Sequence, residues 1–201
     1  MSALPLQDVA KQDVQKPGSS ARQSTVLAVV AIFSALIAVG TILSIPLPAP
    51  LYEITWSPPI YMALSLMVDP WTAASAIGIG SFMGEAFNVA YKGGGSPIYP
   101  FGMIWARAPE AVIIGWARTK SEKMMVLAMV GATVFETLAF FFPDWLFYKY
   151  ALFQYPPQGG TWPSFLVAAG DFGTLADLAY IPVALLLVRA ARPAFRRLGF
   201  G

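Results

Sequence analysis

The chain of 201 residues has no cysteine and no histidine, and only 12% of its residues are charged. These absences exclude a disulfide framework, a thiol nucleophile, a Cys/His zinc site and histidine acid–base catalysis. Soluble domains carry about 25% charged and roughly 45–50% apolar residues, whereas 57% of this chain is hydrophobic. The net charge of +2 gives no reason to expect nucleic-acid binding. The composition is typical of a small multi-pass membrane protein.

Long apolar runs are what the sequence does contain. A membrane-crossing helix needs about 20 mostly apolar residues, and runs near this length occupy 25–45, 71–91, 98–117, 124–142 and 164–190. A further run at 57–68 is too short to cross by itself and is either a half-span or is extended backward. We predict an all-α integral membrane protein with a six-transmembrane-helix bundle at 25–190, an N-terminal tail at 1–24 and a basic C-terminal tail at 191–201.

The distribution of lysine and arginine predicts the orientation. Ten of the thirteen basic residues lie at 11–22, 118–123 and 189–197. Since cytoplasmic loops carry the excess of basic residues, we expect these segments, both termini included, on the cytoplasmic side of the cell membrane. Both termini on one side require an even number of crossings, which favours counting the short run as a span.

Two loops on the opposite side, 46–56 and 143–163, are rich in proline and aromatic residues. The first carries Tyr52, Glu53 and Trp56. Each loop is either a re-entrant or interfacial connector or a lid, and the sequence leaves both open.

Charged residues inside the predicted spans are candidates for function, because a carboxylate at the centre of a lone helix costs about 2.5–3.5 kcal/mol. At about 1.5 Å per residue, Glu85, Glu136 and Asp171 all lie about 9–10 Å from the outer ends of their helices. We expect them to form an outward-facing acidic pocket; the alternative is that each is protonated or bonded to hydroxyl or backbone groups. Arg107 and Glu110 lie deeper, three residues apart, which favours an intrahelical pair.

Such a pocket favours a ligand with positive charge or several hydrogen-bond donors. Asn88 shares a helix face with Glu85, and aromatic walls that stack on flat heterocycles and attract cations are available. We predict no catalytic residue, no metal and no cofactor. The predicted substrate-binding residues are Trp56, Glu85, Asn88, Trp105, Arg107, Glu110, Glu136 and Asp171.

Small residues mark one stripe of the first span, at Ala28, Ala31, Ala35 and Ala38. Such stripes let helix backbones approach closely, so we expect the stripe to dock another helix, either within the bundle or in a partner protein.

The ordered combination of these features resembles a known family. The AIFSA motif (31–35), the proline-rich loop after it, the junction LSLMVDPWTAASAIGIGSFMGE (64–85) and six spans in about 200 residues are similar to the S components, the substrate-binding membrane subunits, of energy-coupling factor (ECF) vitamin transporters. Within that family, GEAFNVAYKGGGSPIYPFGMIWARAPEAVIIGWAR (84–118) resembles the hydroxymethylpyrimidine/thiamine group.

The resemblance implies a high-affinity substrate-binding and translocating subunit of an ATP-driven importer for a small, flat, cationic vitamin or precursor. It implies that Ala31 and Ala35 dock a transmembrane coupling subunit, which two ATPase subunits bind from the cytoplasm. The chain itself has no G-x-x-x-x-G-K-[ST] phosphate loop, and we expect no enzymatic activity in it. The alternatives are a non-catalytic accessory or assembly subunit of a larger membrane complex, a membrane enzyme and a proton-coupled carrier.

Overall fold

A computed structural model describes residues 19–46, 53–92 and 96–200 of the chain. They are almost entirely helical. The elements are α1 (Ser19–Ile42), β1 (Ser44–Pro46), β2 (Glu53–Thr55), α2 (Pro58–Met67), α3 (Pro70–Phe87), the π-helical turn η1 (Asn88–Lys92), α4 (Tyr99–Trp116), α5 (Glu122–Tyr150), α6 (Thr161–Ala168), the 3₁₀ helix η2 (Ala169–Tyr180) and α7 (Ile181–Arg197).

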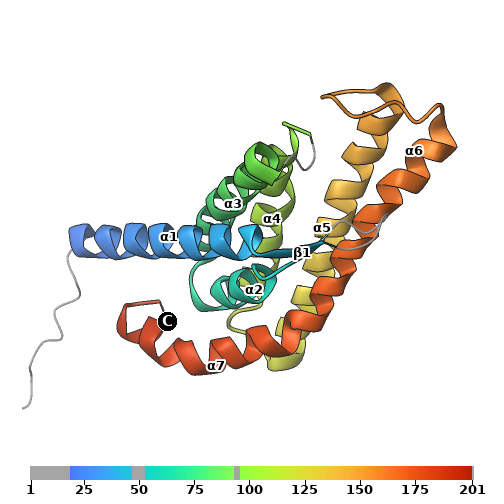
Figure 1. The fold of residues 1–201 in the computed structure, drawn as a ribbon. Helices are drawn as coiled ribbons and strands as arrows, with labels where there is room; N and C mark the ends of the chain where they lie inside the picture. Colours follow the sequence, from blue (N-terminus) through green and yellow to red (C-terminus); the bar gives the residue numbers. More distant parts are fainter. Residues whose placement is uncertain (1–18, 47–52, 93–95, 201) are drawn as a thin grey trace, which may run out of the picture.

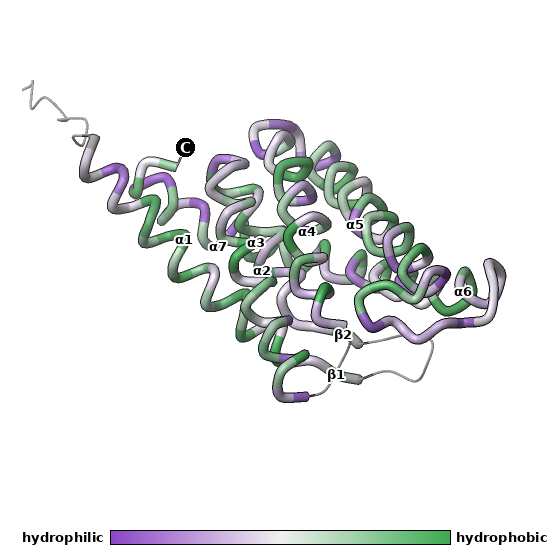
Figure 2. Tube along the Cα trace, turned by 90° about the horizontal axis from the view of Figure 1, so that it is seen from above, coloured by the Kyte–Doolittle hydropathy of each residue, from purple (hydrophilic) through white to green (hydrophobic). Residues whose placement is uncertain are grey.

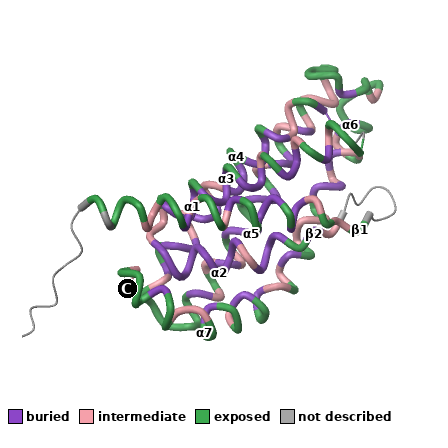
Figure 3. The backbone as a smooth tube through the Cα atoms, turned by 60° about the vertical axis from the view of Figure 1, so that its left-hand side comes forward, coloured by how far each residue is buried: buried purple, intermediate pink, exposed green. Residues whose placement is uncertain are grey.

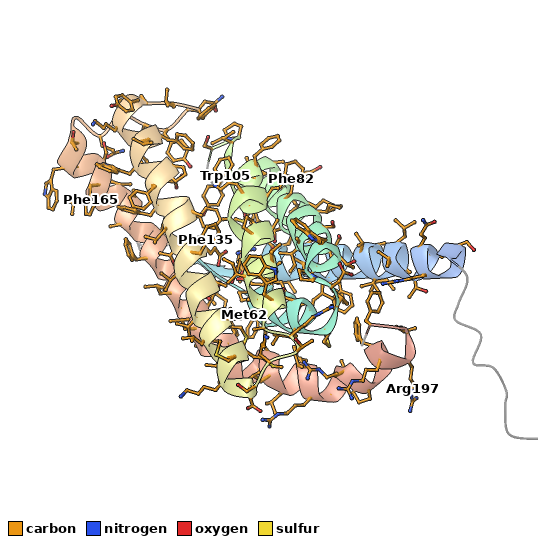
Figure 4. All side chains as sticks on the ribbon, turned by 180° about the vertical axis from the view of Figure 1, so that it is seen from behind. Met62, Phe82, Trp105, Phe135, Phe165 and Arg197 are labelled. Atoms are coloured by element: carbon orange, nitrogen blue, oxygen red, sulfur yellow. The ribbon has the colours of Figure 1, made fainter. Side chains whose placement is uncertain are left out.

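Neighbouring helices follow one another in space in the order α1, α3, α4, α5 and η2. The helix α2 lies at the centre, and α7 packs beneath it (Figure 1). The beginning of α1 and the end of the chain lie on the same side of the molecule in two perpendicular views (Figures 1 and 2). The rings of Phe33 and Phe195, whose centroids are 5.7 Å apart, join α1 and α7 there. Phe165 and Arg197 lie at opposite ends of the run formed by α6, η2 and α7 (Figure 4).

Three helical runs of the described chain are long and apolar enough to cross a membrane: Arg22–Ile42, Glu122–Tyr150 and Thr161–Arg197. Large hydrophobic side chains lie exposed along them, among them Leu27, Ile32, Leu127 and Leu186, and apolar colour follows the helices in Figure 2. Exposed apolar surface of this extent indicates a membrane protein.

The short run at 57–68 forms α2, a helix of ten residues that is buried almost throughout (Figure 3). Ser57 precedes it and two prolines open it, at the positions where proline costs a helix nothing. Asp69 is the N-cap of α3, because its carboxylate accepts a hydrogen bond from the backbone N–H of Thr72 at 3.0 Å.

Several predicted boundaries differ from the structure. The helix α1 begins at Ser19 rather than at 25, and α7 continues to Arg197 rather than ending at 190. The ends of the predicted loop 46–56 pair as β1 and β2, with Ile45 opposite Ile54. Residues 47–52, which include Tyr52, lie outside the described residues.

The loop predicted at 143–163 is wrong over its first eight and its last three residues, since α5 runs through Pro143 to Tyr150 and α6 begins at Thr161. A proline inside a helix leaves the carbonyl four residues earlier without its N–H partner. Here that carbonyl belongs to Ala139, and the indole N–H of Trp105 donates to it at 3.1 Å. A side chain of α4 thus replaces the missing bond, and the helix continues.

Two glycines let α1 and α3 approach closely. A methyl group on Gly80 would lie 2.6 Å from the carbonyl oxygen of Ser34, and one on Gly84 would lie 2.6 Å from the side chain of Thr41. Ser34 also donates its hydroxyl to a carbonyl of α3, that of Ala76, at 3.0 Å. This is the close backbone packing that glycines four residues apart permit in membrane helices.

The alanine stripe of α1 only partly serves that contact. Ala38 is buried beside α3, whereas Ala28, Ala31 and Ala35 are exposed in the described structure. Most of the stripe is therefore an exposed face of the described structure.

Gly80→Ala is expected to destabilise the protein by about 1–3 kcal/mol, because the added methyl group meets backbone that cannot move aside. Gly131→Ala in α5 is the matched control, since a methyl group there meets nothing within 4 Å. Thermal unfolding of both variants in detergent measures the difference. Equal melting temperatures would contradict the close α1–α3 contact.

Candidate ligand-binding cavity

A cavity of about 510 Å³ lies between α3, η1, α4, α5 and η2, at the end of the molecule where α1 stops. Four carboxylates and two basic side chains line it together with aromatic rings. The residues that line it are Thr55, Glu85, Asn88, Lys92, Ser96, Tyr99, Met103, Arg107, Phe140, Asp144, Tyr148, Gln154, Tyr155, Pro156, Gly170, Asp171, Gly173, Thr174 and Asp177.

Arg107, a buried residue of α4, lines the cavity. Its Nε donates to Oε1 of Glu136 on α5 at 2.8 Å, and both side chains are at most 6% exposed. Its Nη1 lies 3.3 Å from the hydroxyls of Ser57 and Ser81, and its guanidinium lies over the ring of Tyr61. One side chain thereby contacts α3, α5 and the N-terminal end of α2.

More acid surrounds Arg107 than it can neutralise. The hydroxyl of Tyr61 lies 3.3 Å from Glu136 and 3.2 Å from Asp177. Because one hydroxyl has one hydrogen, both contacts are hydrogen bonds only when one of these carboxyls carries a proton. The carboxyl of Glu110 is fully buried beside that of Glu136 and receives no hydrogen bond from a donor in the described residues.

Asp144 and Asp171 lie at another part of the cavity wall and interact electrostatically. The hydroxyl of Tyr155 donates to Oδ1 of Asp144 at 2.9 Å. Burial, together with the nearby Asp144 carboxylate, raises the pKa of Tyr155, so this hydroxyl stays protonated and remains a donor. Asp171 is 1% exposed, and neither of its oxygens has a hydrogen-bond partner among the described residues.

The side of the cavity next to α1 is held by Glu85, Asn88 and Lys92. The amide of Asn88 donates to Glu85 and to the carbonyl of Thr41, each at 3.3 Å. Lys92 donates to the carbonyl of Ile42 at 2.5 Å and lies 3.2 Å from the hydroxyl of Ser44. The amide oxygen of Asn88 is buried without a partner in the described residues, which leaves one acceptor available at this wall.

The 3₁₀ geometry of η2 aligns its polar residues. In a 3₁₀ helix, side chains three residues apart eclipse one another, and Asp171, Thr174 and Asp177 accordingly form one column that lines the cavity. Gly170 and Gly173 form a neighbouring column without side chains. Twelve residues is long for a 3₁₀ helix, and a 3₁₀ stretch between α-helical segments often marks a functional hinge or a strained sequence.

The structure brings half of the predicted site residues to the cavity: Glu85, Asn88, Arg107 and Asp171 line it. Glu136 and Glu110 are buried behind Arg107 rather than lining the space.

The two predicted tryptophans lie elsewhere. Trp56 is 51% exposed and contacts the ring of Tyr180. Trp105 donates its indole N–H to the Ala139 carbonyl that Pro143 leaves without a partner. The predicted Arg107–Glu110 pair is wrong, because Arg107 reaches across to α5. The predicted acidic pocket forms only in part, because Glu85 and Asp171 line the cavity whereas Glu136 is buried against Arg107.

Sequence reasoning misses Asp144, because it predicts that the helix ends before Pro143. A signal for it exists, because Glu136, Phe140, Asp144 and Tyr148 recur at four-residue intervals straight through the proline. Residues four apart share a helix face, and the last three of these line the cavity.

Arg107→Gln is expected to destabilise the protein by about 3–5 kcal/mol, because it leaves Glu136 buried without its cation. Adding Glu136→Gln should recover a large part of the loss. Arg189→Gln is the control: Arg189 pairs with Glu122 at 2.7 Å, with side chains 64% and 56% exposed, and such pairs contribute about 0–1 kcal/mol. Thermal unfolding compares the wild type, Arg107→Gln, the double variant and Arg189→Gln. If Arg107→Gln were as stable as the double variant, the buried Arg107–Glu136 pair would be contradicted.

Comparison of the chain with models of protein families, with curated proteins and with solved structures finds no match. The chemistry of the cavity, the arrangement of the helices and the sequence resemblance described above are therefore the basis for inferring a function.

Proposed function

We propose that the protein is the substrate-binding and translocating subunit of an ATP-driven, ECF-type importer. Its substrate is a small, flat, cationic vitamin or precursor, with thiamine or hydroxymethylpyrimidine favoured. The sequence resemblance supports the family and the vitamin class. The cavity supports the binding of a small cationic solute independently of that resemblance.

The observation that carries the proposal is the cavity itself. Its volume of about 510 Å³ falls within the roughly 300–1,000 Å³ of small-molecule sites. Its lining combines four carboxylates with the rings of Tyr99, Phe140 and Tyr148. Aromatic faces accept flat heterocycles and attract cations, and the excess of carboxylates over bases favours positive charge.

We propose that the protein lies in the cell membrane and crosses it six times, with both termini in the cytoplasm. The packing of the basic segments supports this orientation. Arg192 of α7 donates to the carbonyl of Arg118 at 3.2 Å, so the α4–α5 connection and the C-terminal helix meet. The cavity lies at the far end, where it would take solute from outside.

Energy and coupling would come from partners. Since the chain has no phosphate loop, two ATPase subunits and a transmembrane coupling subunit are proposed to complete the transporter. The exposed Ala31 and Ala35 on α1 are the proposed docking face for the coupling subunit. The same face could also dock a partner of an accessory subunit that binds no ligand. That alternative leaves unexplained why Asp171 has no hydrogen-bond partner among the described residues.

The test is calorimetric titration of the detergent-purified chain with thiamine, hydroxymethylpyrimidine, riboflavin, biotin and pantothenate. We expect saturable submicromolar binding of one of the first two. Met103→Trp, which fills the cavity, should abolish it. Met83→Trp is the matched control, because Met83 is 54% exposed on α3 and does not line the cavity.

Binding that survives Met103→Trp would remove the cavity from the proposal. Absence of binding across the panel, by protein with an intact cooperative melting transition, would favour the accessory subunit.

A further inference from the structure

The carboxylates of the cavity differ in how far their hydrogen-bonding capacity is used. Asp177 lies within reach of the Tyr61 hydroxyl, Asp144 accepts from Tyr155, and Glu85 accepts from Asn88. Asp171 lines the same cavity, is 1% exposed, and has no partner at either oxygen among the described residues. A buried carboxylate left in this state is costly, unless a ligand supplies the donors.

Both basic side chains among the described residues that line the cavity are engaged away from Asp171. Arg107 is bound to Glu136, and Lys92 is bound to the carbonyl of Ile42 and lies against Ser44. Asp171 interacts electrostatically with another carboxylate that lines the cavity, that of Asp144 on α5. Two interacting carboxylates that form no ion pair within the described residues fit a cation that comes from the ligand.

We propose that Asp171, with Asp144 beside it, holds the positively charged end of the ligand and selects a cation that carries N–H donors. Carboxylate oxygens only accept hydrogen bonds, so a quaternary nitrogen cannot satisfy them. A planar amidinium-like edge, such as a protonated aminopyrimidine, presents two parallel N–H groups to the two oxygens of a carboxylate. This inference rests on the proposed function and specifies the substrate class of the same cavity.

The geometry of η2 places Asp171 in a column whose other polar side chains are already engaged. Thr174 stands three residues after Asp171 in the same column, and its hydroxyl is engaged with Thr137 at 2.6 Å and with the carbonyl of Asp171. Asp171 is therefore the member of the column left free for a ligand. The adjacent Gly173 adds no side chain, so a flat cation has space beside the carboxylate.

The test compares three probes of similar size: benzamidine, its neutral isostere benzamide, and benzyltrimethylammonium, whose charge has no N–H. Each is titrated calorimetrically into the full detergent-purified chain, and Met103→Trp checks that the heat comes from the cavity. We expect benzamidine to bind at least about tenfold more tightly than either other probe, as expected for a charge-assisted bidentate contact.

Two carboxylate-to-amide variants locate the contact. Asp171→Asn should weaken benzamidine binding by about tenfold or more, and Asp144→Asn should weaken it less. Glu122→Gln, which changes an exposed carboxylate on the outside of α5, should leave it unchanged. Asp171→Asn should keep or raise the melting temperature, since it removes a buried unpaired charge; a lowered melting temperature would mean that Asp171 is satisfied in the folded chain, and would overturn the proposal.

Equal affinities for benzamidine and benzamide, or unchanged benzamidine affinity in Asp171→Asn, would also overturn the inference. If a vitamin still bound with wild-type affinity to Asp171→Asn, the inference alone would fail and the proposed function would stand. If neither the vitamins nor benzamidine bound to the wild-type chain, both would fall.

Discussion

The arrangement of the helices around the cavity depends on one buried cation. Arg107 leaves α4, pairs with Glu136 of α5, and contacts hydroxyls at the start of α2 and on α3. Tyr61, beneath its guanidinium, lies against Asp177 and so connects the same cluster to η2. A buried arginine must keep its partners, because breaking a buried pair costs far more than the pair contributes. The positions of these elements are therefore coupled, and the cavity wall is part of that coupling.

Parts of this design can be predicted from the sequence, and the reasons are local. Apolar runs predict the helices. Because charged residues are rare inside these runs, Glu85, Arg107 and Asp171 are predicted to belong to a polar site. Depth along a helix follows from its rise per residue. The rise does not tell which neighbouring helix a side chain faces. For this reason the sequence predicts that Arg107 pairs with Glu110 on its own helix. The cross-helix pair with Glu136 depends on how α4 and α5 face each other, which no single run determines.

The helix through Pro143 shows a second limit of sequence reasoning. Proline ends most helices because a carbonyl loses its partner. Whether a side chain elsewhere supplies one is a matter of tertiary structure, here of Trp105 on α4. The consequence reaches the site, since Asp144 and Tyr148 line the cavity only because α5 continues. The period-three pattern of η2, small, polar and apolar in turn, is by contrast visible in the sequence.

The 3₁₀ helix also sets a length. Each residue advances about 2.0 Å in a 3₁₀ helix and about 1.5 Å in an α-helix, so the twelve residues of η2 reach about 6 Å further than they would as an α-helix. A change to α-helical winding would draw α6 and α7 together by that amount. It would also turn Asp177 about 120° away from the face of Asp171. The acidic column therefore exists only while the segment stays stretched, and any ligand that binds to the column holds the segment at its full length.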